Sequence, residues 1–262
     1  MWSVEGEVRG KIMKKYLSGN FAYQTNIGRT RLTNEDRSIG LTNSKGDVLL
    51  IVCDGMGGQN KGDLAASIAV DVLKDEFENH KGSFLNRFIA SLWLKNSIKK
   101  ANTTIYNESS RNEEYVGMGT TITALLIVKT FIVLAQAGDS RAYLLKDNEL
   151  VQISEDQTYV AYLYRTGQIT KEEMLTHSKR HVLMNALGIY PSLNLDVNTF
   201  NYNNETILLC SDGLYNDVSH NDMQNIMRNH DSVQQKVNEL IQISNANGGS
   251  DNVAVVVWEA TK

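Results

Sequence analysis

Cysteines and long apolar runs are scarce in this sequence of 262 residues. The first scarcity argues against a disulfide-rich protein, and the second argues against a membrane-spanning one. Cys53 and Cys210 are too few for a disulfide framework and lack the spacing of a zinc site, so a reducing, cytoplasmic location is expected. The longest apolar stretch, residues 122–137, is interrupted by Lys129 and Thr130, so neither a transmembrane segment nor a membrane partner is expected. The first residues lack the apolar core of a secretory signal.

An excess of one charge is also missing, because 26 Lys and Arg stand against 30 Asp and Glu, giving a formal charge of -4. No nucleic-acid partner is therefore expected. The chain is 42% hydrophobic and 21% charged, which suits a buried core and excludes wholesale disorder. Proline-, glycine- or serine-rich linkers are absent. We expect a leader or tag-like extension over 1–20 and one domain over 21–262, with a polar insert, the flap, at 155–190.

Apolar runs bounded by turn residues predict the strands. Residues 47–55 and 206–213 are typical of strands buried on both faces, and each run ends in Asp-Gly. Between them, four short runs predict a local antiparallel meander: 120–128, 131–137, 141–146 and 149–153. A last strand is expected over 253–258.

Helical periodicity is present in four segments: 63–79, 83–109, 219–229 and 231–245. Asp63 is the expected N-cap of the first helix. In the second helix, an apolar stripe is expected to cover a sheet, and it comprises Phe84, Phe88, Leu92 and Ile98.

Acidic residues gather at apparent strand ends, namely Glu35, Asp36, Asp54, Asp139, Asp212 and Asp251. This oxygen-only set favours Mg²⁺ or Mn²⁺ over zinc. Without cations, carboxylates gathered in one cleft would repel one another and take up protons. An Asp-Gly pair taken alone is more often a turn than a ligand.

Seven motifs occur in order along the chain. The first two are GxxRxxNED over 28–36 and DGMGG over 54–58. The others are GMGTT at 117–121, AGDSR at 137–141, NALG at 185–188, SDGL at 211–214 and SDN at 250–252. Together they resemble the metal-dependent protein phosphatases, the type 2C serine/threonine phosphatases, in their bacterial form.

The resemblance covers most of the chain and implies an α+β fold, a four-layer αββα sandwich of two antiparallel sheets flanked by helix pairs. It implies a monomer that removes phosphate from phosphoserine and phosphothreonine in proteins, which would be substrates of a cognate serine/threonine kinase. The reaction would be in-line attack by a water that bridges two metal ions, Mn²⁺ or Mg²⁺.

The same resemblance implies the site residues. Asp54 would bridge the two ions, with Asp212 and Asp251 on the first and Glu35 and the Gly55 carbonyl on the second. Asp36 belongs to the same ligand set, and Asp139 would hold a third ion together with Asp212. Arg31 would bind the phosphate oxygens, because a planar guanidinium can donate two hydrogen bonds at once.

The leaving serine or threonine oxygen needs a proton, and here the sequence departs from the family. Where relatives carry histidine after Asp-Gly or Gly-Gly, this chain has Met56 and Gln59. A metal-bound water is the expected donor. His177 and His181 in the flap are secondary candidates, and for both a structural or exposed role stays open.

Two further flap residues are interpreted from sequence. Gln157 replaces a histidine that is usual in the family, and we expect the replacement to affect substrate fit. Tyr159 is a candidate substrate contact, or it packs the insert against the body.

Two other functions use the same fold. A pseudophosphatase that binds phosphoproteins without turnover would have lost metal-binding aspartates, and all of them are present here. A phosphatase of small phosphomonoesters would use the same residues, so the motifs do not exclude it.

Overall fold

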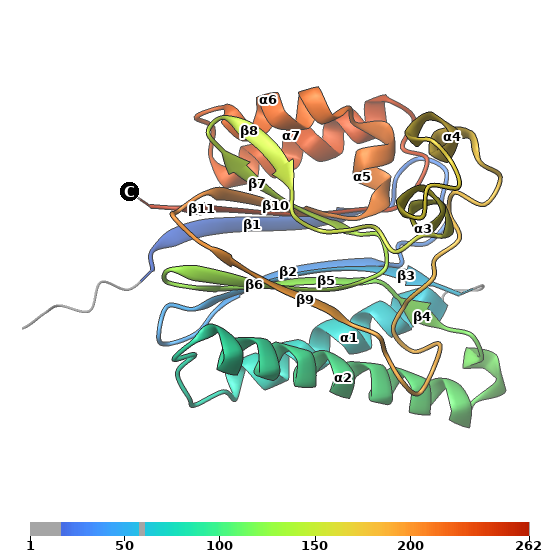
Figure 1. Cartoon of the computed structure of the whole chain (residues 1–262), viewed down its shortest axis with the longest axis horizontal. Helices are drawn as coiled ribbons and strands as arrows, with labels where there is room; N and C mark the ends of the chain where they lie inside the picture. Colours follow the sequence, from blue (N-terminus) through green and yellow to red (C-terminus); the bar gives the residue numbers. More distant parts are fainter. Residues whose placement is uncertain (1–16, 58–60, 262) are drawn as a thin grey trace, which may run out of the picture.

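Two antiparallel sheets are stacked between two layers of helices in the computed structural model, which describes residues 17–57 and 61–261 (Figure 1). The expected four-layer sandwich is therefore confirmed. Gln59 and most of the expected leader lie outside the described residues. The first strand begins at Gly19, inside the range expected for that leader.

The strand order of the first sheet is β1-β11-β10-β7-β8, and that of the second is β2-β3-β5-β6-β9, with β4 paired to β3. The first sheet comprises β1 (Gly19–Asn26), β7 (Arg141–Lys146), β8 (Glu149–Gln152), β10 (Thr206–Cys210) and β11 (Val253–Ala260). The second comprises β2 (Asp36–Thr42), β3 (Val48–Met56), β4 (Gly119–Thr120), β5 (Ile122–Val128), β6 (Phe131–Ala137) and β9 (Asp196–Asn201).

Helices cover the outer face of each sheet (Figure 1). The second sheet is covered by α1 (Lys61–Glu78) and α2 (Arg87–Arg111). The first sheet is covered by α5 (Asp212–Asp217), α6 (His220–Arg228) and α7 (Val233–Ala246). The flap contains α3 (Tyr159–Arg165) and α4 (Lys171–Thr176), and a 3-10 turn (Glu113–Tyr115) follows α2.

Strand β3 shows why its residues form a continuous apolar run. Leu49, Ile51 and Cys53 pack in the core beneath α1 and α2, whereas the alternate residues Leu50 and Val52 pack between the two sheets. A strand in the middle of a sandwich has no polar face, which is what the unbroken run predicted. Strand β10 repeats the arrangement in the other sheet.

The expected meander is wrong at its centre. Strands β5 and β6 pair within one sheet, but β7 and β8 belong to the other, and β7 pairs with β10. The chain crosses between the sheets at residues 138–140, where Gly138 has a φ of 106°. A Cβ on Gly138 would come within 2.5 Å of the Thr121 side chain, so this crossing requires glycine.

Two helix features also differ from expectation. Asp63 lies in the first turn of α1 instead of capping it, and it forms an ion pair with Arg37. In α2, Phe88 is 75% exposed and Leu92 is 48% exposed, whereas Ala90, Leu94 and Ile98 are buried. The covered face of α2 therefore carries Ala90, Leu94 and Ile98, and Phe88 and Leu92 lie on its exposed side.

The run predicted as one strand over 206–213 ends earlier than expected. Strand β10 stops at Cys210, and Asp212 is the first residue of α5. Asp54, by contrast, remains within β3. No helix in the described part of the chain is long and apolar enough to cross a bilayer.

Candidate active site

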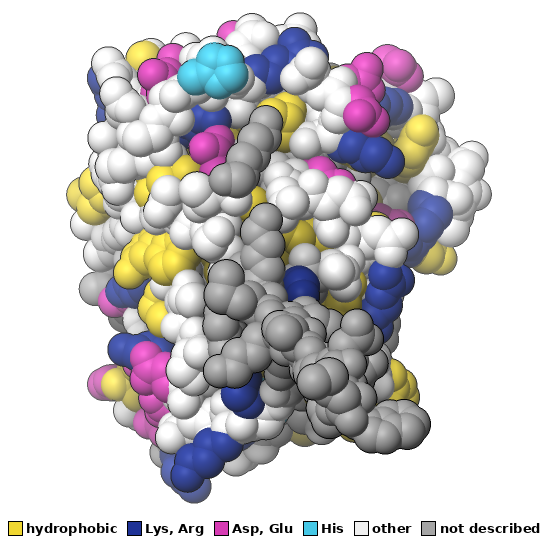
Figure 2. Space-filling view, turned by 90° about the vertical axis from the view of Figure 1, so that its left-hand side faces the viewer, with side chains coloured by type: hydrophobic (Ala, Val, Ile, Leu, Met, Phe, Trp, Pro, Cys, Tyr) yellow, Lys and Arg dark blue, Asp and Glu magenta, His cyan; other side chains and the backbone are white. Residues whose placement is uncertain are grey.

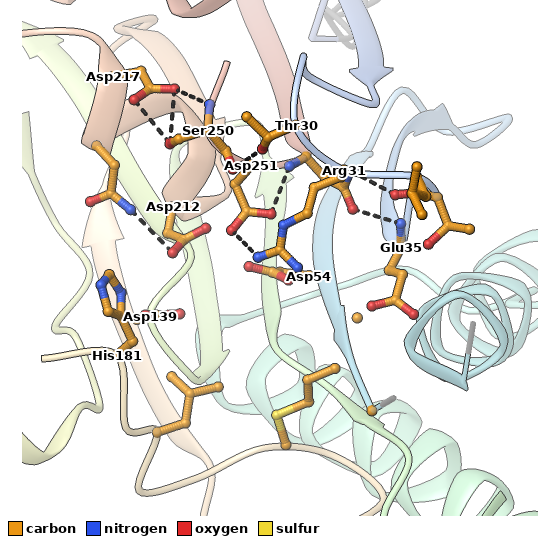
Figure 3. Close-up of a pocket in the computed structure, with 18 of the residues that line it drawn as sticks. Thr30, Arg31, Glu35, Asp54, Asp139, His181, Asp212, Asp217, Ser250 and Asp251 are labelled. Atoms are coloured by element: carbon orange, nitrogen blue, oxygen red, sulfur yellow. Dashed lines mark hydrogen bonds and ion pairs between the residues drawn. The ribbon is translucent and has the colours of Figure 1, made fainter. Parts of the chain in front are cut away.

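A pocket of about 1180 Å³ opens at one end of the sandwich, with part of the flap in its wall (Figure 3). The acidic residues that line it are Glu35, Asp54, Asp139, Asp212, Asp217 and Asp251. They are supplied by the loop before β2, by β3, by the β6–β7 turn, by α5 and by the loop before β11. Segments far apart in sequence therefore bring carboxylates to one place, as the motifs predicted.

The far end of the molecule offers a contrast. There, a hollow of about 620 Å³ is lined by apolar residues such as Phe84 and Phe131 and by Lys45 and Lys129, with Asp47 as its acidic member. Apolar, basic and acidic side chains are interspersed over that end of the molecule (Figure 2). The carboxylates gather at the opposite end, which marks the larger pocket as the candidate active site.

Thr121 ties the segments that carry Asp54 and Asp139. The Asp54 amide donates to Thr121 Oγ1 at 2.9 Å, and the Thr121 amide donates to the Asp54 carbonyl at 2.8 Å. Thr121 Oγ1 also lies 2.8 Å from Ser140 Oγ, next to Asp139. These buried hydrogen bonds hold the two carboxylates in a defined relation.

Asp36 differs from the other predicted ligands because it does not line the pocket. It is 1% exposed and lies opposite Asp54 in the β2–β3 pairing. Ser211 Oγ donates to Asp36 Oδ2 at 2.6 Å and joins the two sheets behind the pocket. The structure thus places Asp36 beside Asp54 in the sheet and behind the pocket.

Burial and mutual repulsion raise the pKa values of these carboxyl groups. Desolvation, followed by the charge of Asp212, raises the pKa of Asp139 to about 7. Desolvation raises the pKa of Asp36 to about 8, against the opposing hydrogen bond from Ser211. The pKa of Asp54 is raised well above its usual value, by burial and then by neighbouring aspartates.

Arg31 enters the pocket from the loop before β2. Its Nη2 donates to Asp251 Oδ2 at 2.7 Å, while its side chain remains 53% exposed (Figure 3). Gly28 lets this loop approach β11: a Cβ there would lie 2.2 Å from the Asp251 carbonyl oxygen, and its φ is 78°.

Asn252 fixes the same loop at three points. Its Oδ1 accepts from the Glu35 amide at 2.9 Å, and its Nδ2 donates to the carbonyls of Ile27 and Thr33, both at 2.9 Å. The side chain is buried, so these bonds are shielded from water. Asn252 was part of a recognised motif, but its role in orienting the arginine loop was not predicted.

The structure separates the three flap candidates. His181 lines the pocket, together with Arg180 and Leu183 from the same segment. His177 does not: its Nδ1 accepts from the Lys179 amide at 3.0 Å, and its ring lies 6.0 Å from that of Tyr159. Tyr159 is likewise outside the pocket lining and packs within the flap.

Hard divalent cations fit the donor set by chemistry. The lining offers carboxylate oxygens and the Gly55 backbone, and such cations would offset the repulsion that raises the carboxyl pKa values. Across residues 17–57 and 61–261, however, no three His, Cys, Asp or Glu side chains are grouped closely enough to hold an ion as they stand.

Known proteins share both the sequence and the fold. The family described as Protein phosphatase 2C matches residues 25–256. The serine/threonine phosphatase stp of Listeria welshimeri is 36% identical over 238 residues, which cover 90% of this chain and 94% of that protein.

Solved structures agree with this match. The serine/threonine phosphatase Stp1 from Staphylococcus aureus superposes with a TM-score of 0.88 at 32% identity, over 97% of this chain and 100% of that chain. The catalytic domain of the protein phosphatase PstP, in complex with 2 manganese ions, gives a TM-score of 0.82 at 31% identity, over 94% of this chain and 100% of that chain. With its sandwich, its pocket of carboxylates and a family match over nearly its whole length, the chain belongs to the protein phosphatase 2C family.

Proposed function

We propose that this protein phosphatase removes phosphate from phosphoserine and phosphothreonine in proteins by in-line attack of water on phosphorus. The observation that carries the proposal is the delivery of carboxylates from five separate segments to one pocket, beside an exposed arginine. The relatives named serine/threonine phosphatase support the substrate class.

The proposed cofactors are two Mn²⁺ or Mg²⁺ ions, with a third ion at Asp139. The groups that would hold the pair are the carboxylates of Asp54, Asp212, Asp251 and Glu35 and the carbonyl of Gly55. Support comes from the oxygen donors in the pocket and from the relative in complex with 2 manganese ions. When bound, such ions supply the Lewis acidity that activates water and neutralises charge on the phosphoryl oxygens.

Arg31 is proposed to bind the phosphate. Its guanidinium is half exposed, faces the carboxylates and is oriented by Asp251 and by the loop that Asn252 fixes. A planar fork of donors matches two phosphate oxygens, and the pairing with Asp251 reduces the side-chain entropy lost on binding.

His181 is proposed as a donor of the proton that the leaving alkoxide requires. Of the histidines in the described part of the chain, it is the one that lines the pocket. Asp212 lies near enough to interact electrostatically with this imidazole. His177 is assigned no part in catalysis, because it lies outside the pocket lining.

The proposed setting is the cytoplasm, where a monomer would act on the substrates of a cognate serine/threonine kinase. Cys53 and Cys210 are buried and free, in keeping with a reducing compartment.

Hydrolysis of an aryl phosphate by the full chain tests the proposal. We expect turnover with Mn²⁺, loss of turnover on addition of EDTA, and recovery when Mn²⁺ is returned in excess. A folded protein that hydrolyses the ester equally well in EDTA, or not at all with either metal, would overturn it.

A further inference from the structure

The base of the flap is joined to the turn that carries Asp139. Asp156 accepts from Arg141 Nε and Nη2, at 3.0 and 2.6 Å, just after the crossing between sheets. The Arg141 guanidinium also lies 3.5 Å from the centre of the Tyr215 ring, and Tyr215 Oη donates to the Asp139 carbonyl at 3.2 Å. The flap therefore starts from a point that is fixed to the active-site turn.

Gln157, the next residue, joins three segments through its side chain. Its Oε1 accepts from the Gly138 amide at 3.1 Å and from Asn185 Nδ2 at 2.8 Å. Its Nε2 donates to Asp196 Oδ2 at 2.5 Å, at the start of β9. One side chain thus connects the turn before Asp139, the end of the flap and the edge of the second sheet.

The backbone of Gln157 makes two of these connections, to the turn before Asp139 and to the end of the flap. Its amide donates to the Gly138 carbonyl at 3.0 Å, and its carbonyl accepts from the Met184 amide at 2.8 Å. The neighbouring residues Thr158 and Leu183 form an isolated antiparallel bridge. Residues 182–184 are therefore held beside 157–159, and this places Arg180, His181 and Leu183 in the pocket wall.

A carboxamide suits this position. The oxygen accepts from two donors while the nitrogen donates to a carboxylate, which uses both ends of the group. A glutamate would lose the donor and bring a second negative charge to Asp196, and a side chain without polar atoms would lose all three bonds.

We propose that Gln157 is a positioning residue, which holds the pocket wall at 180–183 against the turn at 138–140 and so fixes the flap relative to Asp139. The inference rests on the proposed phosphatase function, because the wall would contact the residues that flank the phosphorylated side chain. Loosening it weakens the binding of a phosphopeptide more than that of a small aryl phosphate, which has no flanking residues to contact the wall.

The test compares the full-length wild type with Gln157→Met, which keeps the length of the side chain and removes its hydrogen bonds. Gln157→Glu keeps the acceptor oxygen and loses the donor. Gln168→Ala is the matched control, because Gln168 is an exposed flap residue whose side chain bonds only Thr166 among the described residues. Amide hydrogen exchange is followed over 136–141 and 180–186, and kcat and KM are measured with Mn²⁺ for a phosphothreonine peptide and an aryl phosphate.

We expect Gln157→Met to speed exchange in both segments together and to raise KM for the peptide by about tenfold, the factor that one or two lost net hydrogen bonds imply. The KM of Gln157→Met for the aryl phosphate should stay close to that of the wild type. For Gln157→Glu, the exchange rates and the peptide KM should lie between those of the wild type and Gln157→Met. Gln168→Ala should match the wild type in all of these measurements. Faster exchange in one segment alone, or an unchanged peptide KM, overturns the proposal.

Exchange is measured without turnover, so the two proposals fail separately. An inactive wild type would contradict the phosphatase function, whereas uncoupled exchange would contradict the role of Gln157. If Gln157→Met does not fold, Asp196→Ala removes only the bond to Nε2, and it is expected to shift exchange in the same direction by less. No shift in exchange with Asp196→Ala would then overturn the proposal.

Discussion

Arg31 is exposed to solvent, yet it forms an ion pair with an aspartate of the pocket. This arrangement predicts that Arg31→Lys raises KM for a phosphopeptide by about ten- to a hundredfold, the range for losing a charge-assisted, two-pronged contact. The change in kcat should be smaller. Steady-state kinetics with Mn²⁺ checks the prediction, and Arg29→Ala, a neighbouring exposed arginine, is the control. Equal KM values for wild type and Arg31→Lys would refute a phosphate-binding role.

The flap histidines allow a paired comparison. His181→Ala should lower kcat for a phosphothreonine peptide by about a hundredfold, as expected for loss of a general acid. The loss should be much smaller for an aryl phosphate, because a phenolate leaves without a proton donor. His177→Ala should resemble the wild type with both substrates. Equal losses with the two substrates would show that His181 does not protonate the leaving group.

Some residues of the site could be predicted from the sequence, and others could not. The motifs identified all the acidic residues that line the pocket except Asp217, because aspartates next to turns in that order occur in a recognisable family. They did not show that Asp36 lies behind the pocket, since its position depends on the pairing of β2 with β3 and on Ser211 from the other sheet. Nor did they distinguish His181 from His177, which depends on how the flap folds back.

At the scale of elements, the loop before β2 depends on Asn252. Asn252→Ala removes three partly buried hydrogen bonds and leaves backbone groups of residues 27, 33 and 35 without these partners. We expect a loss of stability of about 1–3 kcal/mol, the usual cost of unsatisfied buried polar groups, and a raised KM. Urea unfolding with EDTA and kinetics with Mn²⁺ measure the two effects. Asn247→Ala, which removes one exposed bond, should change neither.

The elements themselves were predicted unevenly. Strands β3 and β10 were evident because their residues are buried on both faces. The assignment of β7 and β8 to the other sheet was not evident from the sequence, because the pattern of apolar residues within a strand does not show which strand it pairs with. The exposure of Phe88 in α2 was not predicted for a similar reason. The expected apolar stripe was built from large side chains, so it did not include the alanine that lies on the covered face of the helix. Tertiary packing decided both.

For the molecule as a whole, the gathered carboxylates should make stability depend on pH. The pKa of Asp139 is raised to about 7 and that of Asp36 to about 8, so between about pH 4 and pH 8 the folded state binds more protons than the unfolded state. Stability therefore falls as pH rises through this range. Thermal unfolding in EDTA at pH 5 and pH 8 should give the lower Tm at pH 8, and Mn²⁺ should raise the Tm at pH 8. A higher Tm at pH 8 in EDTA would contradict these directions.

The most direct test of the account is phosphate release from a phosphothreonine peptide by wild type and Asp54→Asn, each with Mn²⁺. Asp54 lies at the centre of the acidic pocket, so we predict Mn²⁺-dependent release by the wild type and a loss of about a thousandfold in kcat/KM for the variant, equivalent to about 4 kcal/mol. The variant should remain folded and be more stable in EDTA at pH 8, since one repelling carboxylate is gone. Comparable rates for wild type and Asp54→Asn would contradict the central claim.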